Sequence, residues 1–267
     1  MDIHFLTEFG SNYQMHFLAL DEMDTLLGFI DANIYEFRIS ISSIYVFEEY
    51  RGNGIADVML DEFLMTLSEN NLFMDVSFTY VLDDEIKELD KFINRRPDFS
   101  VYSDSYEFVV SSDVWNNCKM SERLRAYRKK AEDIKKLTGR QKNSVVKGFM
   151  NYAIDITDYG KTIDQIYNPE LSFTVLDKEE LKAGLLSTIS EKADGPKTIE
   201  IKALMCEPGS EMHLMTVLAA FFTKAIDKYK EYEIRFVTIS ESAENLVNKL
   251  FEGKVQRKAI KTAVWDM

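Results

Sequence analysis

The chain has 267 residues and a net charge of −13, and 46% of its residues are hydrophobic. With 11 Gly and four Pro, this composition excludes a disordered chain. The longest strongly apolar stretch, Leu214 to Phe222, is shorter than the roughly 20 residues that cross a bilayer, so no membrane partner is expected. The start, Met-Asp-Ile-His, lacks the features of a secretory signal, and two cysteines, Cys118 and Cys206, make no disulfide framework. We therefore expect a cytoplasmic protein.

The N-terminal part of the chain predicts a β-rich α/β unit. Apolar patterns predict strands over Thr25 to Ile34 and over Ser40 to Phe47, followed by a loop that contains glycines. Helical spacing of apolar residues predicts a helix from Gly54 to Ser68, and a further strand runs from Phe73 to Tyr80. The residues before Ser40 read as two or three strands, with no long helix among them.

Charge divides the chain into three parts. Residues 1–115 carry a net charge of −17, residues 116–142 carry +7 and residues 143–267 carry −3. Such steps are typical of boundaries between folding units. We therefore expect one domain over residues 1–115, a connection over 116–142 and a second domain over 143–267.

The connection has a helical pattern of its own. Between Lys119 and Lys142, apolar residues recur at spacings of three or four, with Ser121 as a plausible N-cap and Gly139 as a plausible C-terminal glycine. The pattern predicts a basic amphipathic connecting helix. Its basic face could pack on the domains and meet solvent, or it could bind a nucleic acid. A nucleic-acid partner is not favoured, because the acidic first domain would repel phosphates.

The C-terminal part repeats the plan of the first. The spacing from strand glycine to loop glycine is 26 residues for Gly28 and Gly54 and 25 residues for Gly184 and Gly209. The matching order of strand, strand, loop, helix and strand favours a duplication. Its second copy comprises strands 181–189 and 198–205, a helix from Glu211 to Tyr229 and a strand from Glu233 to Ile239.

The segment with the clearest chemistry is Val46 to Ala56, which reads V-F-E-E-Y-R-G-N-G-I-A. It joins an apolar strand to an amphipathic helix. Gly52 and Gly54 permit unusual dihedral angles and a close approach of a ligand to the backbone. The free N–H groups of Asn53, Ile55 and Ala56, together with the helix dipole, would suit a pyrophosphate.

This segment resembles the GCN5-related N-acetyltransferases (GNAT), because R-G-N-G-I-A fits their Q/R-x-x-G-x-G/A signature, and Leu26 to Ile30 fits their preceding strand. The resemblance implies a tandem of two GNAT-like α/β domains (of α+β type), each a mixed, mostly antiparallel sheet flanked by helices. It implies acetyl-CoA as cosubstrate, and no metal is expected. The residues implied for its binding are Val46, Phe47, Arg51, Gly52, Asn53, Gly54, Ile55 and Ala56.

Two other interpretations of the loop are weaker. The run Gly52 to Asp57 falls one glycine short of the dinucleotide fingerprint, and the next strand starts rather than ends with an acidic residue, Asp75. Alternatively, the glycines do no more than form a turn that caps a helix.

The resemblance weakens beyond this motif. The family often carries a tyrosine that protonates the leaving thiolate, and here the slot is Phe92, Ile93 or Asn94, depending on register. In the second domain the corresponding loop, C-E-P-G-S, has one glycine and no arginine, and Glu207 and Glu211 would oppose a pyrophosphate. We therefore expect the second domain to be a degenerate scaffold, with a second CoA site as the alternative.

The leading hypothesis is an acetyl-CoA-dependent N-acetyltransferase in which an amine attacks the thioester directly. A backbone N–H near Val46 or Phe47 is the candidate to polarise the carbonyl, Glu48 or Glu49 to act as base, and Tyr80 to act as acid. His4, His16 and His213 stand alone in the sequence and are interpreted as structural.

The alternatives are a non-catalytic acyl-CoA-binding or regulatory module, and a pure interaction protein. The acceptor is expected to be a small-molecule or peptide amine, and the acidity of residues 1–115 favours a cationic one. The sequence does not decide whether the protein forms a homodimer.

Overall fold

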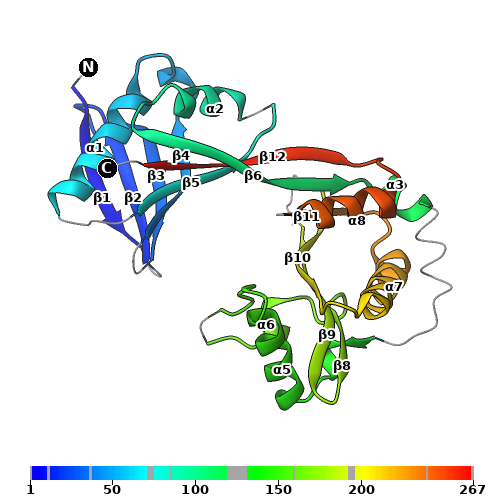
Figure 1. The fold of residues 1–267 in the computed structure, drawn as a ribbon. Helices are drawn as coiled ribbons and strands as arrows, with labels where there is room; N and C mark the ends of the chain where they lie inside the picture. Colours follow the sequence, from blue (N-terminus) through cyan, green and yellow to red (C-terminus); the bar gives the residue numbers. More distant parts are fainter. Residues whose placement is uncertain are drawn as a thin grey trace. The chain divides into compact units, whose positions relative to one another are not determined.

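The computed structural model describes residues 2–10, 13–35, 38–70, 75–84, 86–118, 131–158, 160–191, 196–238 and 240–265 (Figure 1). The chain divides into two compact units. Unit 1 comprises Met1–Asp104 and Ala259–Met267, and unit 2 comprises Ser105–Lys258. These limits differ from the predicted 1–115 and 143–267, because the last strand of the chain belongs to unit 1.

Unit 1 is built on a mixed sheet with the strand order β1-β2-β3-β4-β5-β12. All neighbouring pairs are antiparallel except β4 and β5, which are parallel. This arrangement confirms the predicted mostly antiparallel sheet. The strands are β1 (His4–Phe9), β2 (Gln14–Leu20), β3 (Leu26–Ile34), β4 (Arg38–Val46), β5 (Asp75–Val81) and β12 (Gln256–Trp265).

Two helices, α1 (Ile55–Glu69) and α2 (Lys87–Asn94), share one hydrophobic core with the sheet of unit 1. α1 packs across β2, β3 and β4 (Figure 1), and its apolar side, including Met59 and Phe63, is fully buried. Among the described residues, no helix covers the opposite face of β1–β4. The sheet of unit 1 is therefore covered by helices on one face at these strands, whereas the sheet of unit 2 is covered on both faces.

Unit 2 has the strand order β6-β11-β10-β9-β8-β7. Its β10–β11 pair is parallel, like β4–β5 in unit 1. Its strands are β6 (Phe99–Val110, which begins in unit 1), β7 (Glu132–Asp133), β8 (Phe173–Asp177), β9 (Glu180–Ser190), β10 (Thr198–Cys206) and β11 (Glu233–Thr238). Its helices are α3 (Ser112–Asn117), α5 (Gly139–Met150), α6 (Ile163–Ile166), α7 (Glu211–Lys228) and α8 (Glu241–Phe251).

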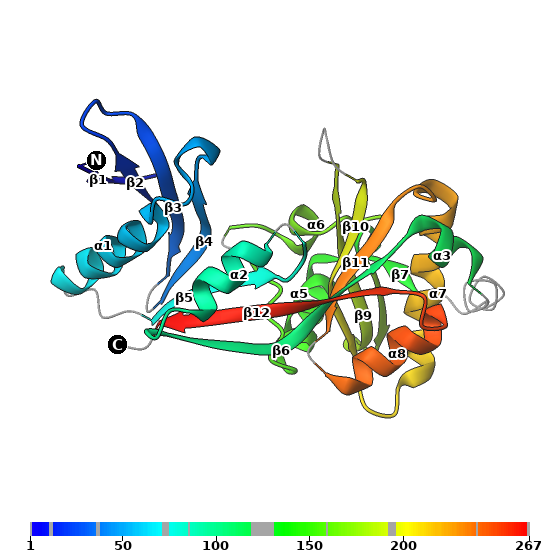
Figure 2. The same ribbon diagram turned by 90° about the horizontal axis from the view of Figure 1, so that it is seen from above.

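Helices cover both faces of the sheet of unit 2 (Figure 2). α7 and α8 share one core with Ala183 and Leu185 of β9. α5 and α6 share a second core with Leu181 and Leu186 of the same strand. No helix of the described residues is long and apolar enough to cross a membrane.

The two units follow one plan but exchange their last strand. In each unit a parallel pair brackets a long helix, which is α1 in unit 1 and α7 in unit 2. The strand that follows α2 is β6, and it pairs with β11 of unit 2. The strand that follows α8 is β12, and it pairs with β5 of unit 1. The predicted common order of strand, strand, loop, helix and strand is confirmed in both units, and the exchange explains why the boundaries of the units differ from the steps in charge.

The predicted connecting helix over Lys119 to Lys142 is wrong where it can be compared. Residues 119–130, which include Ser121, lie outside the described residues. Residues 131–138 form β7 and a 3-10 turn rather than a helix, and Gly139 begins α5 instead of ending a helix. The physical reason is a capping box, in which Thr138 Oγ1 accepts a hydrogen bond from the Gln141 N–H and Gln141 Oε1 accepts one from the Thr138 N–H.

Gly28 lets β3 lie close to β4. A Cβ atom at Gly28 would lie 2.5 Å from the carbonyl oxygen of Tyr45, which is backbone and cannot turn away. We expect Gly28→Ala to lower the free energy of unfolding by about 1–3 kcal/mol, measured by urea denaturation. Gly139→Ala is the control, because a Cβ there meets no atom within 4 Å, and it should not destabilise the protein. Equal stability of both variants would contradict the expected clash.

Candidate active site

The loop between β4 and α1 forms an open cradle of backbone N–H groups. Gly52 and Gly54 have φ angles of +80° and +76°, and a Cβ atom on either would meet no protein atom within 4 Å. The first helical hydrogen bond of α1 runs from Val58 N–H to Gly54 O (3.2 Å). The N–H groups of residues 52–57 have no acceptor within the described part of the chain. The cradle can therefore receive an anion at the positive end of α1.

Side chains hold this loop in place. Arg51 Nε donates to Val46 O (2.9 Å), and its guanidinium stacks over the ring of Tyr45. The side-chain amide of Asn53 donates to Tyr50 O (3.1 Å). Arg51 remains half-exposed beside the cradle and supplies a positive charge next to the free N–H groups.

A cavity of about 400 Å³ opens between this loop and α2. It is lined by Val46, by residues of the loop and of the first turn of α1, by Glu88 and Phe92 of α2, and by Arg95, which directly follows α2. Arg95 lies 2.7 Å from the carboxylate of Asp57 in the first turn of α1 and so offsets a negative charge that would oppose an anion. Of the binding residues predicted from the motif, six line this cavity and two, Phe47 and Asn53, do not; the six are Val46, Arg51, Gly52, Gly54, Ile55 and Ala56.

Arg96 ties α2 to α1. Its guanidinium contacts the carboxylates of Asp57, Asp61 and Asp98, at 3.8, 2.5 and 2.8 Å. The hydrogen bond to Asp98 is the main cause that raises the pKa of Arg96, so the group stays charged. These ion pairs fix the distance between the two helices that border the cavity.

The edge of β4 is free where the strand approaches the cradle. β4 and β5 pair from Arg38 with Asp75 to Ile41 with Phe78, and no pair between them is found beyond that point in the described residues. A bulge at Ser42 marks the divergence, since Asp31 pairs with Ser43 and Ala32 pairs with Ile41. The freed edge suits a ligand that pairs with the backbone in the manner of a strand.

The structure distinguishes between the two backbone N–H groups that were predicted to polarise the thioester carbonyl. Phe47 N–H donates to Leu27 O (3.0 Å), so it is not free for a ligand. Because N–H groups alternate in direction along a strand, Val46 N–H points to the opposite side, toward the freed edge. Of the two predicted donors, Phe47 is wrong in this role, and Val46 remains.

Glu48 and Glu49 lie in an exposed 3-10 turn, Glu48–Tyr50, just after β4. The Glu48 side chain is 81% exposed and lies 3.7 Å from Arg51. Neither glutamate lines the cavity. Their role as bases stays a prediction.

Tyr80 is buried in the core of unit 1, where its hydroxyl donates to Asp90 Oδ1 (2.8 Å). Lys261 of β12 also donates to Asp90 Oδ1 (2.6 Å). Burial, followed by the hydrogen bond to Asp90, raises the pKa of Tyr80. The hydroxyl is therefore a weaker acid than usual, and the Asp90 carboxylate joins β5, α2 and β12.

We expect Tyr80→Phe to lower the free energy of unfolding by about 1–3 kcal/mol, because a hydrogen bond to a charged group is lost. Turnover should change less than about twofold. Thermal unfolding and steady-state kinetics on the same samples test this. A tenfold loss of kcat at unchanged stability would instead favour the predicted role as acid.

The structure places all three residues that were considered for the position of the family's tyrosine. Phe92 and Ile93 are buried in the core of unit 1. Asn94 donates from its side chain to Asp90 O (2.6 Å) and Asp90 Oδ1 (2.9 Å). None of the three can supply a phenolic proton.

Sequence reasoning missed a cluster on the uncovered face of the sheet. β2 and β3 pair His16 with Asp31, and β3 and β4 pair Asp31 with Ser43. His16 Nδ1 lies 2.6 Å from Asp31 Oδ1, and Ser43 Oγ donates to Asp31 Oδ2 (3.3 Å). All three residues are half-buried. With a proton on Nδ1 shared with Asp31, His16 Nε2 is left to accept a proton.

Unit 2 lacks the cradle. Four residues, Glu207–Ser210, join β10 to α7, where eight residues, Phe47–Gly54, join β4 to α1. Glu211 Oε1 accepts the N–H of Gly209 (3.3 Å), and Glu207 forms an ion pair with Lys182 (2.9 Å). Carboxylates thus occupy the position that an anion would need.

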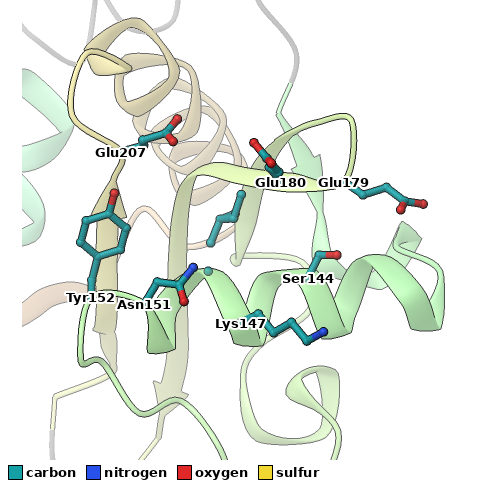
Figure 3. A pocket seen from close by; sticks show the side chains of 9 residues that line it. Ser144, Lys147, Asn151, Tyr152, Glu179, Glu180 and Glu207 are labelled. Carbon is teal, nitrogen blue, oxygen red and sulfur yellow. The ribbon is translucent and has the colours of Figure 1, made fainter.

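A polar pocket of about 530 Å³ lies beside this loop of unit 2 (Figure 3). Lys147 of α5 and Tyr152, two residues beyond the end of α5, line it, together with Glu179 of the β8–β9 turn and Glu180 at the start of β9. The described residues contain no group of three or more His, Cys, Asp or Glu side chains placed to hold a metal ion.

Comparison with known proteins agrees with this geometry. Residues 2–81 match the model of the acetyltransferase (GNAT) family, and no curated protein matches the chain in sequence. Three solved structures that resemble the chain are 10% or 11% identical to it in sequence.

The GCN5-related glucosamine N-acetyltransferase region of a fungal multi-domain GH3 β-N-acetylglucosaminidase has a TM-score of 0.66 over 95% of this chain, which spans 33% of that protein. A tandem GNAT protein from the clavulanic acid biosynthesis pathway has a TM-score of 0.61 over 96% of this chain and 85% of its own. A GCN5-related N-acetyltransferase from Sphaerobacter thermophilus has a TM-score of 0.57 over 92% and 79%. Residues 2–81 of unit 1 therefore match the GNAT family, and the chain has the fold of tandem GNAT proteins.

Proposed function

We propose that the chain is an acetyl-CoA-dependent N-acetyltransferase and that its first unit carries the activity. The observation that carries the proposal is the cradle of unpaired N–H groups at residues 52–57, beside the freed edge of β4. The match of residues 2–81 to the acetyltransferase family supports the same function.

The residues of unit 1 fit acetyl-CoA, which proteins of this fold family use. The open space beside Gly52 and Gly54 leaves room for a pyrophosphate, which the N–H groups of residues 52–57 and the charge of Arg51 would hold. The freed edge at Val46 would pair with the amides of the pantetheine arm. Acetyl-CoA supplies an activated thioester, and the chain must polarise its carbonyl and take up the proton of the amine.

Two sets of side chains in unit 1 could take up that proton. Glu48 and Glu49 stand at the end of β4 but are exposed and lie outside the cavity lining. The His16–Asp31 pair lies on the sheet face beside Ser43, which is further back along β4 from the cradle. A pantetheine arm that starts at the cradle and runs back along the freed edge of β4 leads toward Ser43. Because Ser43 contacts Asp31, the partner of His16, we favour His16 Nε2 as the base.

Titration calorimetry with acetyl-CoA, followed by a thiol-release assay over a panel of amines, tests the proposal. Binding together with acceptor-dependent thiol release is the expected result. Binding without turnover of any amine would favour the alternative, a non-catalytic acyl-CoA-binding or regulatory module. Absence of binding would leave only an interaction protein.

The acceptor is proposed to be cationic, because residues 1–115 carry a net charge of −17. An acidic surface raises the local concentration of cations. The panel therefore includes a polyamine, an aminoglycoside, a basic peptide and glucosamine, the last because one structural relative is a glucosamine N-acetyltransferase region.

For a cationic acceptor, we expect kcat/KM to fall as salt rises from 0.1 M to 1 M, because the screening length shrinks from about 10 Å to about 3 Å. A neutral amine acceptor measured alongside should show no such fall. A preferred acceptor that is anionic, or whose kcat/KM does not respond to salt, would contradict the proposed charge.

A further inference from the structure

Unit 2 contains an apolar cavity that the acetyltransferase function of unit 1 does not use. Its volume is about 400 Å³, within the range of pockets that bind small molecules. β10, α7, β11 and α8 enclose it. Its walls include Leu204, Phe222, Phe236, Val247, Leu250 and Phe251.

The cavity exists because β10 and β11 diverge. Their parallel pairing ends at Ile201 with Phe236. Lys202 is the extra residue of a bulge in β10, since Ile201 pairs with Ser187 of β9 and Ala203 pairs with Leu186. Beyond this point the space between the two strands is lined by side chains of α7 and α8.

Thr238 gives the cavity an unsatisfied polar group. It is the last residue of β11, lines the cavity and is only 3% exposed. Its Oγ1 has no hydrogen-bond partner among the residues that the structure describes. Because a buried hydroxyl without a partner destabilises a protein, this group indicates a ligand that accepts its hydrogen bond.

The other polar groups of the cavity lie at the same end. Lys202 also lines the cavity and directly follows Ile201, which pairs with Phe236, two residues before Thr238. Ser240 and Ala243, at the positive end of α8, also line the cavity. Lys202 forms an ion pair with Glu200, and Glu241 and Glu244 lie in the first turn of α8, where Glu244 pairs with Arg257 at 3.0 Å.

We propose that this cavity binds an aliphatic carboxylic acid. Its chain would lie against the apolar walls, and its carboxylate would accept hydrogen bonds from Thr238 Oγ1 and Lys202 Nζ. CoA itself is not favoured, because the loop from Glu207 to Ser210 is short and bounded by carboxylates. The inference is independent of the function proposed for unit 1.

Titration calorimetry of the full chain with hexanoate, octanoate and decanoate tests the proposal. We expect affinity to rise about fourfold with each added methylene, as apolar burial increases. Decanol should bind more weakly than decanoate, because it carries no charge for Lys202. Failure of decanoate to bind, or equal binding of decanol and decanoate, would overturn the proposal.

Variants locate the ligand. Thr238→Val keeps the shape of the side chain, and we expect it to weaken decanoate binding about tenfold without lowering the melting temperature. Thr174→Val is the matched control, because Thr174 is also buried and without a partner for Oγ1 but does not line the cavity. It should leave decanoate binding unchanged. Equal effects of the two variants on decanoate binding would overturn the proposed site.

Val247→Trp fills the cavity and should abolish decanoate binding in folded protein. If Val247→Trp does not fold, the comparison of Thr238→Val with Thr174→Val still decides the outcome.

Discussion

Gly54→Val is expected to weaken acetyl-CoA binding by at least about tenfold, near 1.4 kcal/mol. Gly54 has a φ of +76°, which a β-branched residue adopts only with strain. No protein atom lies within 4 Å of the position of its missing Cβ, so the valine side chain would enter open space beside the cradle rather than the core. The loss of affinity would then come from a distorted loop and from crowding of the pyrophosphate. Titration calorimetry with acetyl-CoA measures it.

The chain offers a matched control in unit 2. Gly209 has a φ of +80° and equally open surroundings, but it lies in the short loop that carboxylates occupy. Gly209→Val should therefore strain the backbone to a similar degree and leave acetyl-CoA binding unchanged. Unchanged affinity in folded Gly54→Val protein would contradict the assignment of the site to unit 1. A loss with Gly209→Val would favour a second CoA site.

The elements that could be predicted from the sequence are those with a local signal. β3, β4 and α1 begin and end within two residues of the predicted bounds, because apolar periodicity and the glycines of the loop mark their limits. The same holds for β9, β10 and α7 in the second copy. The exchange of β6 and β12 had no such signal, since the alternation of apolar residues along a strand does not identify its neighbour.

The connection between the two copies shows where apolar periodicity misleads. Ile134 and Leu137 fit a helical stripe, but in the structure they are buried beneath α5 and α6 in a core of unit 2. A threonine three residues before a glutamine, at Thr138 and Gln141, marks the true start of a helix. The local capping signal was therefore a better guide than the longer periodic pattern.

The candidate site likewise has one part that the local sequence predicts and one part that depends on strand pairing. The cradle at residues 52–57 is one continuous segment, so its chemistry could be predicted from its spacing. His16 and Asp31 lie 15 residues apart and meet through the register of a hairpin. The signal that could have found them is the turn between β2 and β3, where the N–H of Asp21 donates to Thr25 O (3.1 Å) and fixes which residues face each other.

His16→Ala is expected to lower kcat by about 10²- to 10⁴-fold if His16 is the base, which is the usual contribution of general base catalysis. Acetyl-CoA affinity should not change, because His16 does not line the cavity at the cradle. The acidic limb of the pH profile of kcat/KM should be lost together with the imidazole. Asp31→Asn should lower kcat less and shift that limb, since Asp31 orients the ring through a 2.6 Å contact but does not itself take the proton.

A second His–Asp pair in unit 1 provides the control. His4 Nε2 lies 3.1 Å from Asp24 Oδ1, and the His4 side chain is half-exposed like that of His16. His4→Ala removes an imidazole beside a carboxylate, but Asp24 lies in the β2–β3 turn rather than beside β4. It should leave kcat and its pH profile unchanged. If Glu48→Gln or Glu49→Gln abolishes the acidic limb while His16→Ala keeps it, the base is the glutamate at the end of β4 and the His16–Asp31 pair only supports the sheet.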